Sequence, residues 1–340
     1  MEKKRKRLVK RRPKRKLTLQ RTRSHAPNEC TQKLLEQAAA SFNEGFDIGY
    51  DEAMMRSQQH SVPETKVKPS SGEGYAKGLY DGGEGIVDSI LPELEVLPEI
   101  SVRHIIEEGM KQLSSQYYRL MSAAEVAGRI KEALDSSSPL SVIRLGDGEL
   151  LTLAQEMVLN EDEVRKEGHF LSYAGVSLPD LIARDLLAAS VRNADIVGIP
   201  KLRLPNFQPL CFSVFRAHGI DYRKLQLTLS TVNYALHLEG LLPGILAGRR
   251  VLVVGNSAPG LSRVLSDRGI KVTGTVAPVE GMHDIPRTMN EIRGHPFDIA
   301  LVGAGIPAVI ITERIASELG KVAIDFGHLA DSLTNGESTL

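Results

Sequence analysis

Short apolar runs alternate with helical stretches from residue 140 to residue 325, and this alternation limits the folds open to the chain. Each run is rich in Val, Ile and Leu, as buried strands are. The predicted strands are 140–145, 196–199, 225–229, 250–254, 271–276, 299–302 and 321–325. Because strands that alternate with helices form parallel sheets covered on both faces, the sequence predicts an α/β, Rossmann-like, mostly parallel sheet.

Helices are expected between these strands and ahead of the first one. Ser122 with Glu125 three residues later is a capping-box signature, and an apolar stripe that includes Val126 and Ile130 follows it. The predicted helices are 99–120, 122–136, 178–191, 207–217, 231–246, 259–268 and 307–319. Strands and helices together predict one domain over residues 99–335.

The start of the chain has a different composition. Residues 1–23 hold 13 of the 42 Lys and Arg residues and one of the 42 Asp and Glu residues, so the rest of the chain carries 29 basic against 41 acidic residues. So dense a positive charge with few apolar residues cannot form a core, and residues 1–29 are predicted to be a disordered basic arm. The arm is interpreted either as a contact to a polyanion or as a solubilising tail.

Residues 30–98 are predicted to be a helical extension with an internal repeat. Small residues four apart beside an aromatic recur in two segments, 45–53 and 74–82, which centre on Gly49 and Gly78. The segments lie in helices expected at 31–58 and 72–91, with a Pro-, Ser- and Lys-rich linker between them. One interpretation is a homo-oligomer or a partner docked through these grooves; the other is a loosely ordered linker.

Three observations bear on the compartment. No apolar run is long enough to span a bilayer, and no apolar segment typical of a secretory signal follows the basic start. The two cysteines, Cys30 and Cys211, suggest no disulfide framework and favour a reducing compartment. A cytoplasmic protein without a transmembrane segment is predicted.

The turn Gly146-Asp147-Gly148-Glu149 joins the first strand to a helix. Its two carboxylates therefore stand at the carboxyl end of a strand, where open α/β sheets bind ligands. Asp147 and Glu149 can hold a divalent cation against a diphosphate, while Gly146 and Gly148 let a phosphate approach the backbone. The alternative is a helix-entry turn, with Asp147 as the cap and Glu149 complementing the macrodipole.

Two other strand ends carry candidate residues. After the strand at 250–254, the turn at Asn256 and Ser257 offers backbone amides at a helix start, but it lacks the Gly-x-Gly of dinucleotide sites. The last strand ends at Asp325, which His328 and Asp331 follow. These three side chains either contact a nucleotide or metal, or serve as a turn cap and ordinary surface polar groups.

Three segments in order resemble the GT-D fold glycosyltransferases over about residues 120–331. They are Arg-Leu-Gly-Asp-Gly-Glu at 144–149, Asp-Ile-Val-Gly-Ile-Pro at 195–200 and Ile-Asp-Phe-Gly-His-Leu-Ala-Asp at 324–331. In that family the first typically reads Arg-Phe-Gly-Asp-Gly-Glu, with the Asp-x-Glu signature, and the last reads much like Ile-Asp-x-Gly-His-x-x-Asp. The chain departs at Leu145, where an aromatic is usual, and after Asp331, where aromatic and acidic residues often follow.

The resemblance implies a hexosyltransferase-type enzyme that uses a nucleotide-sugar donor, a UDP-sugar, and an unidentified glycan or protein acceptor. It carries over Asp147 and Glu149 as the catalytic pair that holds Mn²⁺ or Mg²⁺ and the donor diphosphate. Arg144 is expected to pair with one of these acids or to reach a phosphate. The residues expected at the nucleotide are Arg144, Gly146, Gly148, Asn256, Ser257 and His328, with Asp325, Asp331 and Asp284 as further candidates. For Asp284, helix capping ahead of Pro286 is the alternative.

Two other functions stay open. One is a non-catalytic coat or assembly scaffold that keeps a GT-D-like domain; the presence of both Asp147 and Glu149 favours an enzyme over it. The other is a different Rossmann-like enzyme, such as a methyltransferase, built on the turn at 254–257. The strand that follows that turn has no acid at its end to hold a ribose, which argues against it.

Overall fold

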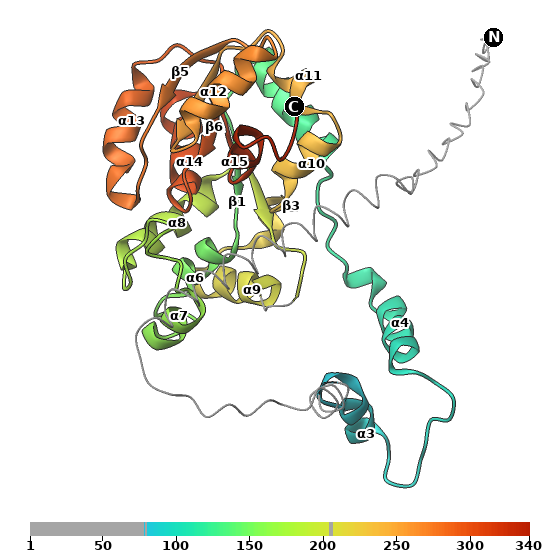
Figure 1. The fold of residues 1–340 in the computed structure, drawn as a ribbon. Coiled ribbons are helices and arrows are strands. Elements are labelled where there is room, and N and C mark those ends of the chain that lie inside the picture. Colours follow the sequence, from blue (N-terminus) through green and yellow to red (C-terminus); the bar gives the residue numbers. More distant parts are fainter. Residues whose placement is uncertain (1–77, 79, 204–206) are drawn as a thin grey trace, which may run out of the picture. The chain divides into compact units, whose positions relative to one another are not determined.

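The structure is a computed structural model that describes residues 78, 80–203 and 207–340. The chain divides into two units, 1–98 and 99–340. The predicted arm at 1–29 and the predicted helix at 31–58 lie outside the described residues. The second unit carries the whole sheet (Figure 1).

The described part of the first unit contains the π-helical turn η1 (Tyr80–Glu84) and helix α3 (Gly85–Ile90). Of the repeat, segment 45–53 lies outside the described residues, whereas Gly78 and Gly82 are described. A methyl group added at either glycine would meet no atom within 4 Å. The described residues therefore supply no packing partner for this groove, and association through it stays a prediction.

The sheet has seven strands, all parallel, in the order β3-β2-β1-β7-β6-β4-β5. The strands are β1 (Leu140–Arg144), β2 (Ile196–Ile199), β3 (Gln226–Leu229), β4 (Val251–Gly255), β5 (Val272–Val276), β6 (Ile299–Gly303) and β7 (Val322–Asp325). Each lies within one residue of its predicted bounds. The prediction of a parallel α/β sheet is confirmed, because every apolar run that reads as a buried strand is one.

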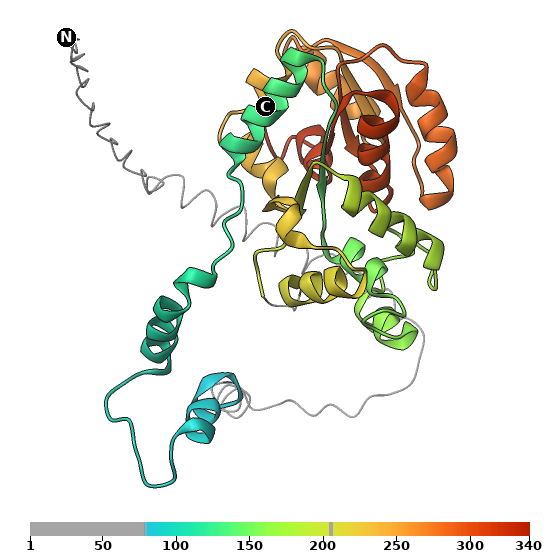
Figure 2. The same ribbon diagram turned by 180° about the vertical axis from the view of Figure 1, so that it is seen from behind.

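Helices cover both faces of the sheet, as Figures 1 and 2 show from opposite sides. On one face, Ile143 of β1 packs in a core with α6 (Asp147–Ala154), α8 (Leu181–Asn193), α9 (Phe207–Ala217), α13 (Ile285–Arg293) and α14 (Pro307–Leu319). On the other face, Val142 packs with α5 (Ala123–Ser136), α10 (Val232–Leu238), α11 (Leu242–Leu246), α12 (Ala258–Asp267) and α15 (Leu329–Thr334). The two cores arise because successive side chains of a strand point to opposite faces.

Two predicted helices differ from the observed ones. The single helix expected at 231–246 is broken into α10 and α11, because Gly240 adopts a left-handed φ of 67° and Pro243 starts a new helix. The helix expected at 99–120 is shorter, with α4 (Val102–Gln112) and the 3₁₀ turn η2 (Ser114–Gln116); α4 has no buried residue that would extend it by packing. The short helix α7 (Glu161–Glu167) was not predicted.

The connections that leave β1 and β7 run to opposite faces of the sheet. β1 continues into α6 on one face, and β7 continues into α15 on the other, although the two strands are paired neighbours. Such a divergence opens a crevice at the carboxyl ends of the two strands, which is where α/β sheets bind ligands.

Candidate functional site

The turn after β1 orients two carboxylates by backbone hydrogen bonds. The N–H of Gly146 donates to Oε2 of Glu149 at 2.8 Å, and the N–H of Gly148 donates to Oδ1 of Asp147 at 2.8 Å. Gly146 is the N-cap of α6, and Asp147 is its first helical residue, so the alternative in which Asp147 caps the helix is wrong. Both acids lie in the first turn, where the positive end of the helix dipole favours negative charge.

A third carboxylate reaches the same crevice from β7. Asp325 ends that strand and is almost fully buried, and its charge acts on Glu149. Burial, followed by the neighbouring carboxylates of Asp325 and Asp147, raises the pKa of Glu149 to about 7. Burial also raises the pKa values of Asp147 and Asp325. Three acids thus lie at the ends of two neighbouring strands, and the ionised form of Glu149 is the most disfavoured.

The positive charge of Arg144 is paired with the carboxylate of Asp325 and not with the acids of the turn that follows Arg144. Its Nη2 donates to Oδ1 of Asp325 at 2.9 Å, and its Nε donates to the backbone carbonyl of the same residue at 3.0 Å. Its Nη1 donates to the carbonyl of Ser230 at 3.1 Å. The predicted pairing of Arg144 with Asp147 or Glu149 is therefore wrong, because a strand neighbour that is remote in sequence takes the guanidinium.

His328 stands beside the same acids. It is exposed at the start of α15, and its charge opposes the raised pKa values of Asp147 and Asp325. The structure therefore brings together four predicted site residues from two strand ends, namely Asp147, Glu149, Asp325 and His328. Both ends were predicted to carry candidates, and the pairing of β1 with β7 makes them one crevice.

Asn256, Ser257 and Asp331 are used differently from the prediction. Oδ1 of Asn256 accepts the N–H of Val279 at 2.8 Å, and the hydroxyl of Ser257 donates to Asp331. These contacts join the turn after β4 to the loop after β5 and to α15. The three side chains thus hold neighbouring loops in place. A nucleotide contact by the backbone amides at the start of α12 stays a prediction.

A loop between α7 and α8 covers part of the carboxyl edge. A Cβ added at Gly148 would lie 3.2 Å from Ile306 and 3.4 Å from the ring of Phe170, so the turn after β1 is closely packed. Farther along the same loop, the carbonyl of Gly175 accepts the N–H of Met282 at 3.1 Å. The loop therefore links the turn at Asp147 to the segment after β5.

That segment carries a cluster that the sequence analysis did not assemble. The potential ligand atoms of Glu280, His283 and Asp284 all lie within 4.8 Å of one another. The spacing of three and four residues in a 3₁₀ turn was the available signal. Asp284 occupies the N-cap position of α13, but its carboxylate accepts from the N–H of Glu280 and pairs with Arg287, so it does not cap the helix as expected. Among described residues no other group of three meets this spacing, so the acids at the β1 and β7 ends stand wider apart.

The acids of the β1 and β7 ends offer the type of ligand atom that a hard divalent cation takes, and a cation there stays a prediction. Asp147, Glu149 and Asp325 supply only oxygen atoms, the ligands that Mg²⁺ and Mn²⁺ take, and their mutual repulsion falls when a cation binds.

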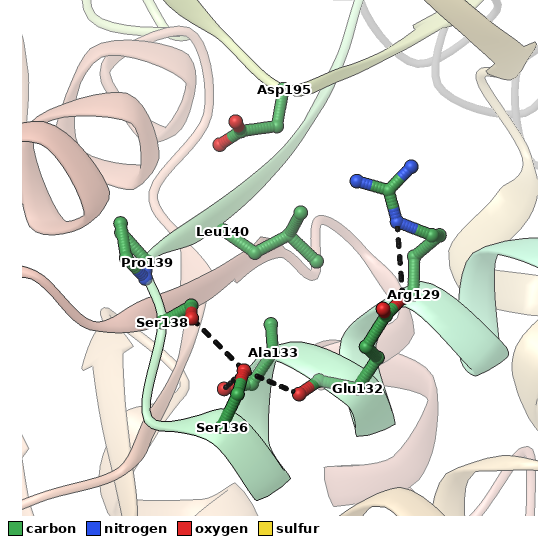
Figure 3. Close-up of a pocket in the computed structure, with 8 residues that line it drawn as sticks. All are labelled: Arg129, Glu132, Ala133, Ser136, Ser138, Pro139, Leu140 and Asp195. Carbon is green, nitrogen blue, oxygen red and sulfur yellow. Dashed lines mark hydrogen bonds and ion pairs between the residues drawn. The ribbon is translucent and has the colours of Figure 1, made fainter.

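A pocket of about 370 Å³ opens at the opposite, amino edge of the sheet (Figure 3). Arg129, Glu132 and Ser136 of α5 line it, and Asp195 faces them from the start of β2. It shares no residue with the crevice at the carboxyl edge. Pocket volume alone therefore does not locate the candidate site in this fold.

Comparisons with known proteins bear on the same region. A family model described as a GT-D fold-like domain matches residues 121–333. No curated protein matches the sequence. Two solved structures match, each at 15% identity over 68% of this chain and 86% of the other, with a TM-score of 0.45. One is a selenomethionine-substituted domain of unknown function 1792; the other is described as that highly conserved domain with a distinct glycosyltransferase fold.

None of the helices in the described part of the chain combines the length and apolar character needed to cross a bilayer.

Proposed function

This chain belongs to the GT-D fold-like family, and from that premise we propose that it transfers a sugar from a nucleotide-diphosphate donor, a UDP-sugar, to an acceptor. Membership supports a glycosyltransferase at the level of the family. The observation that carries the proposal is the group of three acids at the ends of β1 and β7, two of them held by backbone N–H groups. The catalytic domain is proposed to span residues 99–335.

Each residue of the proposed site would have its own role. Asp147 and Glu149 would hold Mn²⁺ or Mg²⁺ together with oxygens of the donor diphosphate. When bound, such a cation stabilises the negative charge that develops on the leaving diphosphate. His328 would donate a hydrogen bond to a phosphate oxygen. The backbone amides at the start of α12, at Asn256 and Ser257, would contribute further donors to the nucleotide.

The crevice also orients the donor. The N–H groups of Gly146 and Gly148 fix the two carboxylates, so little reorganisation is needed when a ligand enters. Phe170 and Ile306 pack closely against Gly148 and leave no room for a larger residue there.

The test is calorimetric titration of UDP with Mn²⁺ and with EDTA. For Asp147→Asn and for Glu149→Gln, the affinity for UDP in Mn²⁺ should fall at least about ten-fold, because a ligand charge is lost while the shape is kept. Asp162→Asn is the matched control, since Asp162 is an exposed acid in the first turn of another helix, α7. Equal binding of UDP by the wild type in Mn²⁺ and in EDTA would remove the cation from the proposal and favour a scaffold.

A further inference from the structure

The segment 81–98 carries acids that have no basic partner among the described residues. It includes most of η1, helix α3 and the chain that follows up to Pro98. It contains five acids and no Lys, Arg or His. All five acids are exposed, and none forms an ion pair with a described residue. They are Asp81, Glu84, Asp88, Glu93 and Glu95.

The apolar side chains of the same segment are exposed as well. Ile90 is 75%, Leu94 is 96% and Val96 is 85% exposed, and α3 has no buried residue. Apolar side chains that gather in the open with polar groups beside them are typical of a protein interaction site. The described residues leave them uncovered, so a partner has to come from the rest of the chain or from another molecule.

Helix α7 is an acidic helix of the same chain in which the side chains are matched. Glu161 of its first turn forms an ion pair with Arg165. Val164, its central apolar residue, is fully buried in the core. An acidic stretch of this chain can thus pair its charge and bury its apolar side chain, and the segment 81–98 does neither among the described residues.

A stretch with the opposite composition lies at residues 3–16, outside the described residues. Eleven of its fourteen residues are Lys or Arg, none is acidic, and Leu8 and Val9 lie among them. Long Lys and Arg side chains lay their aliphatic stems on apolar surface while their charged ends stay in water. Residues of this kind are therefore able to cover side chains such as Leu94 and to pair with the acids beside them.

Connectivity favours this stretch over a separate basic protein. The two segments belong to one chain and are joined by residues 17–80, a length of chain that lets its ends meet at a modest cost in entropy. A contact between tethered segments also has a high effective concentration. Moreover, residues 1–23 hold 13 of the 42 basic residues, whereas the rest of the chain carries 29 basic against 41 acidic residues.

We propose that the segment 81–98 is the docking surface for residues 3–16 of the same molecule, so that a polyanion binds the basic arm only in competition with these acids. The contact does not depend on the function proposed for the acids at the ends of β1 and β7. Because exposed ion pairs are screened by salt, the contact forms at low ionic strength and weakens as salt is added.

Carbodiimide, which joins a Lys amine to a carboxylate that touches it, tests the contact in the full-length protein. Mass spectrometry should find links from lysines of 3–16 to acids of 81–98 at about 20 mM salt, and most of these links should be lost at about 0.5 M salt. A mixture of isotope-labelled and unlabelled protein distinguishes links within one molecule from links between two. Links that go only to acids elsewhere, or only to a second molecule, would overturn the proposal.

A variant without the five acids tests the competition. Replacement of each Asp by Asn and each Glu by Gln should strengthen heparin binding by the full-length protein about five-fold or more, since a docked arm is not free to bind. The difference should disappear when residues 1–29 are deleted from both proteins.

The matched control removes two Asp and three Glu that are exposed and unpaired among the described residues of the other unit. They are Glu156, Asp162, Glu167, Glu239 and Asp267. This control changes the net charge by the same amount, so it should gain less than about two-fold at physiological salt, where distant charges are screened. Equal gains in the two variants would show that general charge and not docking governs the arm. Thermal unfolding shows whether both variants are folded, and the links in the wild type test the contact in either case.

Discussion

The surroundings of acidic side chains differ between the two edges of the sheet: they favour the ionised form at one edge and oppose it at the other. At the amino edge, the carboxylate of Asp298 accepts the backbone N–H of Arg250 at 2.9 Å and pairs with its guanidinium, which holds the pKa of Asp298 at about 2. Asp195 accepts the N–H and the hydroxyl of Ser141 at 2.8 and 2.9 Å. Both acids are matched by donors, and the ionised carboxylate of Asp298 favours the folded state.

At the carboxyl edge burial raises the pKa values of Asp147, Glu149 and Asp325, and the carboxylates of Asp325 and Asp147 raise that of Glu149 further. Burial and the nearby carboxylates act against the ionised form of Glu149, and Arg144 compensates only Asp325. An arrangement that folding alone would not favour is typical of a binding site. Acids occur at both edges of the sheet, and the edges differ in whether neighbouring groups favour or oppose the ionised form.

The largest effect on stability is expected from the amino edge. Asp298→Asn should lower the free energy of unfolding by about 1–2 kcal/mol, the value of charge-assisted hydrogen bonds after allowance for partial exposure. Chemical denaturation at neutral pH measures it. Asp162→Asn, at an exposed acid, is expected to stay within about 0.5 kcal/mol. Equal losses in the two variants would show that the pair of Arg250 and Asp298 does not stabilise the amino edge more than an exposed acid does.

The same pair predicts a dependence on pH. The folded pKa of Asp298, about 2, lies below its ordinary value of 3.8, so its contribution to stability is present above pH 3.8 and is lost as the pH falls through the folded pKa. Between pH 5 and pH 2, the wild type should therefore lose more stability than Asp298→Asn. Denaturation curves at several pH values measure the difference, and parallel curves would contradict the assignment.

A smaller effect is expected at the carboxyl edge. In EDTA, Asp147→Asn and Glu149→Gln should leave the free energy of unfolding within about 0.5 kcal/mol of the wild type, or raise it. Both amides can still accept the N–H groups of Gly148 and Gly146, and a crowded charge is removed. A loss as large as that of Asp298→Asn would mean that these acids are structural and would erase the difference between the edges.

The smallest effect concerns residues outside both edges. Deletion of the predicted basic arm, residues 1–29, should leave the melting temperature and the Mn²⁺ affinity unchanged. We expect it to weaken binding to a polyanion such as heparin, with a loss that depends on salt. A large fall in melting temperature would show that the arm contributes to the fold.

The sequence predicts the strands well because a buried parallel strand is a local signal. Runs such as 251–254 are apolar on both faces and can be recognised without knowing their neighbours. That Asp147 and Asp325 share an edge also follows from the sequence, since the carboxyl ends of parallel strands lie together.

Strand order is not a local signal, and the errors follow from this. Nothing near Arg144 in the sequence indicates that β7 is its neighbour, so the nearby acids were the natural but wrong partners. The roles of Asn256 and Asp331 were missed for the same reason, because their partners come from other loops. The break at Gly240 was a local signal, and the apolar pattern on both sides concealed it.

The place of β7 in the sheet has a consequence for how the molecule is made. Without β7, the remaining strand pairings form two separate sheets, β3-β2-β1 and β6-β4-β5. β7 is the last strand along the chain and joins both by pairing with β1 and β6. During synthesis from the amino terminus, each half-sheet can therefore form before the strand that unites them. β7 also carries Asp325. A nascent chain therefore gains Asp325 at the step in which β7 joins the two half-sheets, and a chain that ends before β7 has neither the seven-stranded sheet nor this acid.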